Sequence, residues 1–270
     1  MTFLALLPTR GVIELSGPDR VSFLQGLVSN DVELARPGHA VWAALLTPQG
    51  KYLTDFFIFS SGETLLLDCD KIALPLLLTR LPRFRLRAKV TIATLDEWTV
   101  YAGWNAIFPN GIAAPDPRLP EAGFRLLSPT VLPTTATETD YDRHRLALGL
   151  PDGARDLEIE KTTLLEANFD ELHGVSWTKG CYLGQELTAR TKYRGLLKRR
   201  LVPVIFDGKL PAPGTPIFRA GVEVGTIRSG LGNRAIANLR LDALDAPLTC
   251  GEVTLAPDIP AWMKLPEKTA

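Results

Sequence analysis

The segment WTKGCYLGQELTAR, residues 177–190, gathers several reactive side chains. Gly180 and Gly184 allow a sharp turn around the cysteine, and the residues after Gly184 are good helix formers. Cys181 would then lie just before a helix N-terminus, with Lys179 two residues away. That arrangement favours a nucleophilic, oxidisable or iron-ligating thiolate. From the residues alone, the alternative is a small cysteine buried in a tight turn.

The same segment offers groups that could bind a ligand. Gln185 and Glu186 provide an amide and a carboxylate, a pair able to read the donor and acceptor edge of a heteroaromatic ring. Glu186 and Arg190 are spaced i,i+4 and should pair on the expected helix. The competing interpretation is a first helical turn that simply faces solvent.

Two isolated carboxylates extend the set of candidate residues. Glu166 lies in the apolar context LLEANF, where a carboxylate either pairs with a cation or faces a ligand. Asp55 interrupts the apolar strand pattern YLTDFFIF. Strict alternation places Leu53, Asp55 and Phe57 on one face, so Asp55 either faces a cavity or breaks the pattern at a strand end.

Other kinds of site are not indicated. The chain has no GxSxG, Walker or HExxH motif, and its three histidines are far apart in the sequence. Three cysteines without a CxxC pair suit neither a disulfide framework nor a four-cysteine metal site. We therefore predict no stably bound metal. The same cysteine usage and the absence of a recognisable targeting segment indicate a cytoplasmic location.

Short apolar runs separated by Gly, Pro and Ser predict the elements that position these residues. VIELSG predicts a strand followed by a helix, and residues 39–69 predict three strands of an antiparallel meander. A helix should begin near Asp70, and RFRLRAKV (residues 83–90) alternates as a strand with one basic face. TETDYDRHRLALG predicts another helix. After residue 197, five short runs predict a small β-barrel: KRRLVPVIF, GTPIF, VEVGTIRS, RAIANLRL and CGEVTLA.

KGCYLGQE, followed by ELTAR and YRG, resembles the signature of the YgfZ-type folate-binding proteins, bacterial relatives of a mitochondrial iron–sulfur assembly factor. Further segments resemble the family in the expected order, among them RGVIELSGPDRVSFLQGLVSND, LLTPQGKYLTDFFIF and RHRLALGLPDG. The resemblance covers nearly the whole chain. It implies an α+β fold shared with the glycine-cleavage T-protein, in which three domains form a ring around a central channel and the last is a small β-barrel. We expect residues 1–45 with 140–196, residues 46–139 and residues 197–270 to be these domains.

The resemblance implies a tetrahydrofolate-binding accessory factor for iron–sulfur cluster assembly or repair, with Cys181 as the functional thiol. Its partners would be iron–sulfur client enzymes or assembly proteins, including enzymes of tRNA modification. The expected ligand-binding residues are Lys179, Tyr182, Gln185, Glu186, Glu166, Asp55 and Arg190.

The alternative function is a folate-dependent aminomethyl transferase. Where the T-protein carries adjacent acidic residues, this chain has the single Asp55, which makes methylene transfer doubtful. We expect an accessory factor rather than a classical enzyme, and a monomer.

Charge is balanced overall but segregated locally. Thirty basic and thirty acidic residues give a net charge of zero, so we expect neither nucleic acid nor membrane as a direct partner. Residues 80–89 and 190–200 are nevertheless rich in cations and contain no anion. These blocks are either solvated faces or a receptor for the carboxylates of a folate polyglutamate tail, whose binding would weaken with salt.

Overall fold

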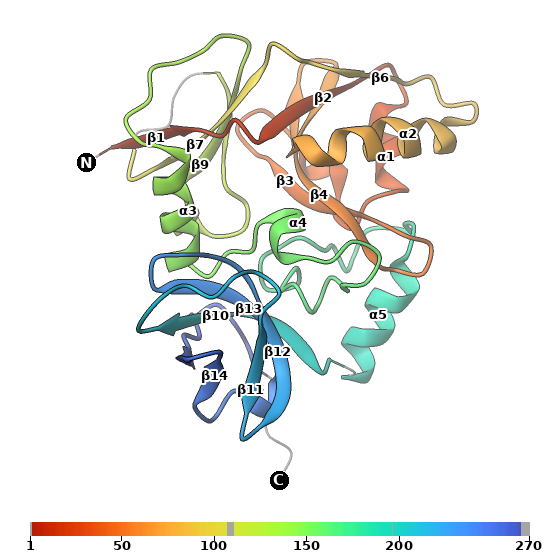
Figure 1. Cartoon of the computed structure of the whole chain (residues 1–270). Helices are drawn as coiled ribbons and strands as arrows, with labels where there is room; N and C mark the ends of the chain where they lie inside the picture. The colour runs from red at the N-terminus through yellow and green to blue at the C-terminus, as the bar shows by residue number, and fades with distance from the viewer. Residues whose placement is uncertain (1, 107–110, 196, 266–270) are drawn as a thin grey trace.

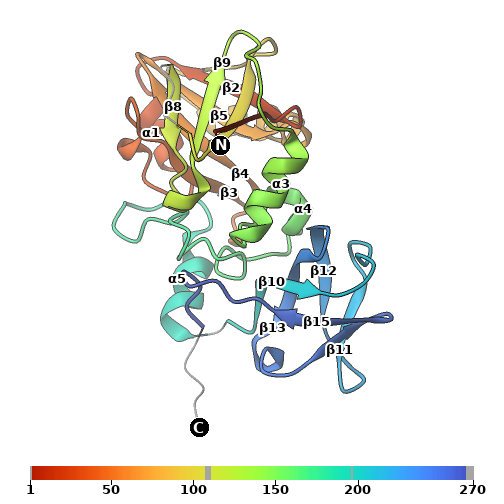
Figure 2. The ribbon, with the colours of Figure 1, turned by 90° about the vertical axis from the view of Figure 1, so that its left-hand side faces the viewer.

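The structure is a computed structural model that describes residues 2–106, 111–195 and 197–265. Three β-sheets dominate it (Figure 1). Two sheets pack into a body, and the third closes into a barrel beside that body. Figure 2 shows α3 and α4 on the side of the body that faces the barrel. Among the described residues, no helix is both long and apolar enough to cross a membrane.

The first sheet has five strands in the order β3-β4-β5-β2-β6, and its neighbouring strands are antiparallel. It confirms the predicted meander and the opening strand. A register shift opposite Leu45 and Leu46 leaves Leu53 as an extra residue in β4. Leu53 and Phe57 consequently join different core clusters, and the strict alternation that we predicted for them is wrong. The bounds are β2 Arg10–Ser16, β3 Val41–Leu46, β4 Tyr52–Ser61, β5 Thr64–Asp70 and β6 Thr91–Thr94.

Helices cover one face of this sheet. Helix α1 (Arg20–Gln25) and helix α2 (Leu74–Arg85) bury Phe23, Leu24, Leu77 and Leu81 against it. As predicted, the second helical segment starts at Asp70, whose carboxylate accepts the Ile72 amide at 3.1 Å before the 3₁₀ helix η2 (Lys71–Ala73). The strand predicted for residues 83–90 is wrong, because α2 continues to Arg85 and the next strand begins at Thr91.

The second sheet packs over the other face of the first. Its order is β1-β7-β9-β8, and a shared core, which includes Trp42, Phe57, Val100 and Leu127, fills the space between the two sheets. The bounds are β1 Phe3–Leu6, β7 Thr99–Trp104, β8 Ile112–Pro115 and β9 Phe124–Ser128. Short 3₁₀ helices η1 (Val32–Leu34) and η3 (Pro120–Ala122) lie in the connections.

Helices α3 and α4 lead from the body toward the barrel. Helix α3 (Glu138–Ala147) confirms the predicted helix, and Thr137 and Asp140 form a reciprocal capping box at its start. Helix α4 (Gly153–Asp156) follows directly. An irregular stretch then runs to α5 (Gln185–Arg194), which ends at Gly195 in the left-handed conformation.

The C-terminal strands close into a six-stranded barrel, in the order β10-β13-β12-β11-β14-β15. We predicted five strands because CGEVTLA looked continuous, but a turn at residues 251–252 divides it between two strands. The bounds are β10 Arg199–Phe206, β11 Pro216–Arg219, β12 Val222–Leu231, β13 Arg234–Arg240, β14 Leu248–Cys250 and β15 Val253–Pro257, with the 3₁₀ helix η4 at Leu241–Ala243.

The domain limits expected from the sequence stay a prediction, and one of them can be located in the first sheet. The limit between residues 45 and 46 falls within β3, which pairs with β4. The strands on the two sides of that limit therefore lie in one sheet, because the short turn after β3 leads directly into the adjacent strand β4.

Candidate functional site

Lys179 anchors the loop that carries Cys181. Its buried ammonium donates to the carbonyl oxygens of Gln25, Val28 and Asn30 at 2.7, 2.8 and 2.7 Å. An ammonium has three N–H donors, so all of them are used by the end of α1 and the turn after it. Burial lowers the pKa of Lys179 to about 8. The structure thus gives Lys179 a positioning role, and a role in binding a ligand stays a prediction.

The next residues of the loop are also held. The Tyr182 ring is buried, lies 5.3 Å from the Lys179 ammonium, and burial raises the pKa of its hydroxyl to about 12. The backbone amide of Leu183 donates to the Gly26 carbonyl at 3.1 Å. Gly184 has a φ of 82° and packs against the turn between β3 and β4. Anchors therefore lie on both sides of Cys181.

Cys181 itself is exposed, whereas Cys69 and Cys250 are buried. Burial also raises the pKa of the Cys69 thiol to about 12. The structure thus disagrees with a buried cysteine in a tight turn and places the thiol at the surface, a few residues before α5. Its reactivity and its function stay predictions.

The first turn of α5 carries the other predicted groups of the motif. Glu186 pairs with Arg190 at 2.5 Å, as their spacing predicts, and the Glu186 side chain is 84% exposed. Gln185 is half-buried. This geometry matches a solvated helical turn, so ligand binding by Gln185, Glu186 and Arg190 stays a prediction.

The two isolated carboxylates lie elsewhere. Glu166 accepts the backbone amide of Thr163 at 2.7 Å and so closes a local turn. Asp55 is buried and accepts from the Trp42 indole at 2.8 Å and from the Tyr52 hydroxyl at 2.6 Å. It therefore lies inside β4 rather than at a strand end.

A cavity of about 630 Å³ opens beside Arg10, between the β1–β2 turn and helices α3 and α4. We call it the Arg10 cavity. None of the eight predicted site residues lines it, although a Cβ on Gly153 would lie 3.5 Å from the Asp55 carboxylate and 3.9 Å from that of Asp70. Its lining residues are Thr9, Arg10, Asp70, Lys71, Ile72, Glu138, Thr139, Asp142, Asp152, Ala154 and Arg155.

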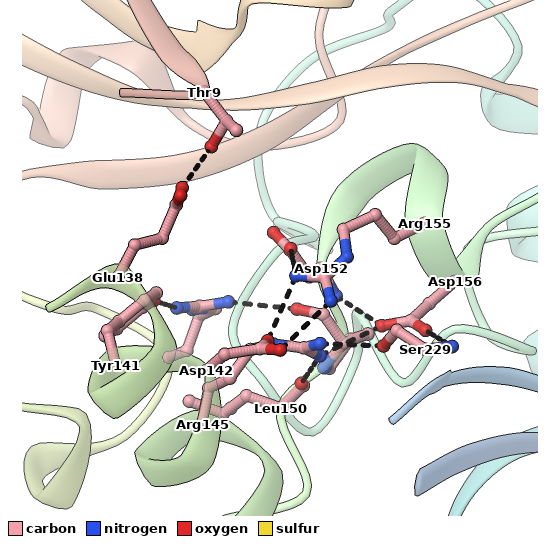
Figure 3. Close-up of polar contacts among 12 residues, drawn as sticks. Thr9, Glu138, Tyr141, Asp142, Arg145, Leu150, Asp152, Arg155, Asp156 and Ser229 are labelled. Carbon is pink, nitrogen blue, oxygen red and sulfur yellow. Dashed lines mark hydrogen bonds and ion pairs between the residues drawn. The ribbon is translucent and has the colours of Figure 1, made fainter. Parts of the chain in front are cut away.

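Ion pairs build one wall of this cavity (Figure 3). Arg155 bonds Asp152 at 2.9 Å and Asp142 at 3.0 Å. Although burial would raise the pKa of Asp152, the surrounding guanidinium groups of Arg145, Arg155 and Arg10 lower it to about 2. Asp152 is therefore a carboxylate at neutral pH.

Behind the cavity, guanidinium groups crowd around one aromatic ring. Arg10, Arg118 and Arg125 lie 5.7, 5.0 and 4.2 Å from the centre of the Phe57 ring. Asp68 holds Arg10 at 2.5 Å and Arg125 at 3.1 Å. Sequence reasoning missed this cluster, because its members come from five separate strands and turns and show no motif.

Arg145 joins α3 to the barrel. Its guanidinium donates to Asp142 at 2.5 Å, to Asp156 at 3.1 Å and to the Ser229 hydroxyl of β12 at 2.7 Å. The Ser229 amide in turn donates to Asp156 at 2.9 Å. Within the described part of the chain, no group of three or more His, Cys, Asp or Glu side chains is placed to hold a metal ion.

Comparison with known proteins confirms the fold. The crystal structure of the glycine cleavage system aminomethyltransferase T from Bartonella henselae superposes with a TM-score of 0.78, covering 98% of this chain and 87% of that one at 16% identity. The model of the CAF17 C-terminal β-barrel domain matches residues 198–265. The predicted T-protein-like fold with a C-terminal barrel is therefore confirmed.

Sequence relatives share one name. The human iron–sulfur cluster assembly factor IBA57, mitochondrial, is 34% identical, covering 95% of this chain and 84% of that protein. The mouse protein of the same name is 33% identical, with 90% and 78% covered. A homologue from Mycosarcoma maydis is 38% identical over 75% of this chain, and the chain spans 57% of its length.

The same relatives correct the expected location. All three are named as mitochondrial, which contradicts the cytoplasmic location that we predicted. The physical reason is that unpaired cysteines report on a reducing environment and not on which compartment supplies it.

Proposed function

This chain belongs to the IBA57 family of iron–sulfur cluster assembly factors. We propose that it acts in iron–sulfur cluster assembly and that the Cys181 thiol contacts the cluster. The observation that carries the second part is the exposed thiol on a loop anchored at Lys179, Tyr182 and Gly184. Holding the loop in one geometry lowers the entropy lost when the thiol meets a large partner.

A single thiolate cannot complete the coordination of a cluster, which generally takes four protein ligands. Cys69 and Cys250 are buried in β5 and β14, away from the surface that carries Cys181. The remaining ligands would therefore come from an assembly protein, a client enzyme or a small thiol. The cluster is cargo in this proposal, shared during transfer.

A complementation assay tests the role of the thiol. In cells that lack the protein, the wild-type chain should restore the activity of iron–sulfur enzymes and the Cys181→Ala variant should not. Cys250→Ala serves as the control, because it also removes a thiol but from a buried strand. Full restoration by Cys181→Ala would eliminate the thiol from the mechanism.

We also propose tetrahydrofolate as a bound ligand of the Arg10 cavity. The volume of about 630 Å³ suits a folate-sized molecule. Asp152 and Asp70 would accept hydrogen bonds from the amino-substituted ring, and Lys71 would pair with a glutamate carboxylate. Asp55, below Gly153, would support this wall through Tyr52 and Trp42. In this role the folate is a ligand and not a reactant.

Isothermal titration with tetrahydrofolate tests the ligand separately from the thiol. Wild type and Cys181→Ala should bind equally well, and Asp152→Asn should bind at least tenfold more weakly. If titration of tetrahydrofolate gave no binding heat with any of these proteins, folate would be removed from the proposal, and the proposed role of the thiol would be unaffected.

The finer assignments stay proposals. The likeness to YgfZ-type folate-binding proteins favours a role in maintaining enzymes of tRNA modification. An aminomethyl transferase activity has less support, because both oxygens of the single candidate carboxylate, Asp55, accept hydrogen bonds from Trp42 and Tyr52.

A further inference from the structure

The end of α2 and the residues after it bring apolar and basic side chains to the surface together. Residues 82–87 are all exposed. Leu86 is 90% exposed and Phe84 is 37% exposed. Figure 1 shows this end of α2, and the chain that leads on to β6, at the edge of the molecule. We call residues 80–89 the α2 tip.

The charges of the α2 tip are all of one sign. It carries five cations, Arg80, Arg83, Arg85, Arg87 and Lys89, and no acidic residue. Within the described residues, its only ion pair joins Arg80 to Glu160 at 3.3 Å. The nearby Asp19 carboxylate is occupied by the backbone amide of Lys89, at 2.7 Å. The tip therefore carries a net positive charge, because the other four cations form no ion pair within the described residues.

Leu86 also has an unusual backbone conformation. Its φ is 44°, and glycine adopts such positive values more easily than leucine does. A fully apolar side chain thus occupies a strained position at an exposed helix end, between Arg85 and Arg87. Solvent exposure alone would favour a polar residue here.

We propose that the α2 tip binds the surface of an anionic lipid bilayer. Phosphate groups would pair with Arg83, Arg87 and their neighbours, while Phe84 and Leu86 enter the boundary between headgroups and acyl chains. The overall neutrality of the chain led us to expect no membrane partner, but a bilayer meets only this local patch.

Other polyanions fit the tip less well. Nucleic acid offers phosphates but no apolar layer for an exposed leucine. The carboxylates of a folate tail would have to reach the Arg10 cavity as well, and none of the five cations lines that cavity. The combination of aliphatic and basic side chains therefore favours lipid, and it does so independently of the role of Cys181.

Vesicle co-sedimentation with the full chain tests the proposal. The probes are vesicles of phosphatidylcholine alone and vesicles with one quarter phosphatidylglycerol. Wild type should bind the anionic vesicles at least tenfold more tightly than the neutral ones. Arg83→Glu with Arg87→Glu should weaken that binding at least tenfold, and Leu86→Asn several-fold. Lys209→Glu and Val222→Asn, exposed changes in the barrel, should leave it unchanged.

Several results would overturn the proposal. They are equal sedimentation with both vesicles, no loss in the Arg83→Glu, Arg87→Glu variant, or unchanged binding after Leu86→Asn. Displacement from the vesicles by a short poly-glutamate peptide at equal charge concentration would identify the tip as a site for acidic protein instead. Circular dichroism of each variant checks that a loss of binding is not a loss of fold.

Discussion

Gly50 and Gly184 face each other across a contact that leaves no room for a side chain on either one. A Cβ on Gly184 would lie 2.9 Å from the Gly50 Cα, and a Cβ on Gly50 would lie 2.7 Å from the Gly184 carbonyl oxygen. Both residues also have positive φ angles, 73° and 82°. Through this contact the turn between β3 and β4 fixes the point at which α5 begins.

Gly184→Ala should destabilise the protein by about 2–4 kcal/mol, because the left-handed backbone and the close contact both oppose a Cβ. Urea denaturation measures the change. Gly180→Ala is the matched control, since a Cβ at Gly180 meets nothing within 4 Å, and it should cost less than about 1 kcal/mol. An equal loss of unfolding free energy in the two variants would contradict a role for this contact.

Lys179→Met should destabilise the protein by about 2–4 kcal/mol, because it leaves three carbonyl groups, two of them in buried contacts, without this donor. It should also make the loop around Cys181 more mobile, which hydrogen exchange of the amides of residues 180–184 would detect. Lys192→Met removes an ammonium that pairs with Asp170 near the surface and should change stability by less than about 1 kcal/mol. A Lys179→Met protein as stable as that control would refute the anchor.

Native protein should react with a thiol reagent at one cysteine, Cys181, and at all three after unfolding in urea. Cys69 and Cys250 are shielded by burial, and the raised pKa of the Cys69 thiol slows it further. Spectrophotometric thiol titration gives the count. Cys181→Ala should show no fast-reacting thiol. Rapid labelling of a second cysteine would show that β5, which holds Cys69, or β14, which holds Cys250, opens readily.

Asp152 should make stability depend on pH in the acid range. Its folded pKa of about 2 lies below its ordinary value of 3.8, so the folded state favours the carboxylate. The contribution is complete above about pH 4 and is lost as the pH falls toward 2. Allowing for partial exposure, Asp152→Asn should cost about 1–2 kcal/mol near pH 6. The difference from wild type in denaturation midpoints should vanish near pH 2, and a constant difference would contradict the assignment.

Local patterns predicted most of the elements. The meander, the capped helix α3 and most barrel strands were accessible because their apolar spacing and turn residues agree with their final burial. The strand predicted for residues 83–90 failed for a specific reason. Its alternation of cations and apolar residues has no buried face, since residues 82–87 are all exposed, so the period carried no information about packing.

The candidate site was predicted in composition but not in geometry. The motif with Cys181 is visible in the sequence, yet the carbonyl groups that hold Lys179 come from residues 25–30. Glu166 looked like a ligand because its sequence neighbours are apolar, and it instead closes a turn through a backbone amide. Contacts between distant segments of this kind have no local signal, which is also why the guanidinium groups around Phe57 were missed.

The hydrogen bond between Arg145 and Ser229 affects how cooperatively the protein unfolds. The buried guanidinium ties α3, Asp156 and the barrel strand β12 into one network, and the ion pair of Arg228 with Glu158 lies beside it. If the barrel alone opened, the buried charges of Arg145 and Asp156 would lose their partner Ser229 in β12. The barrel and the two-sheet body should accordingly melt in a single calorimetric transition, even though each has a core of its own.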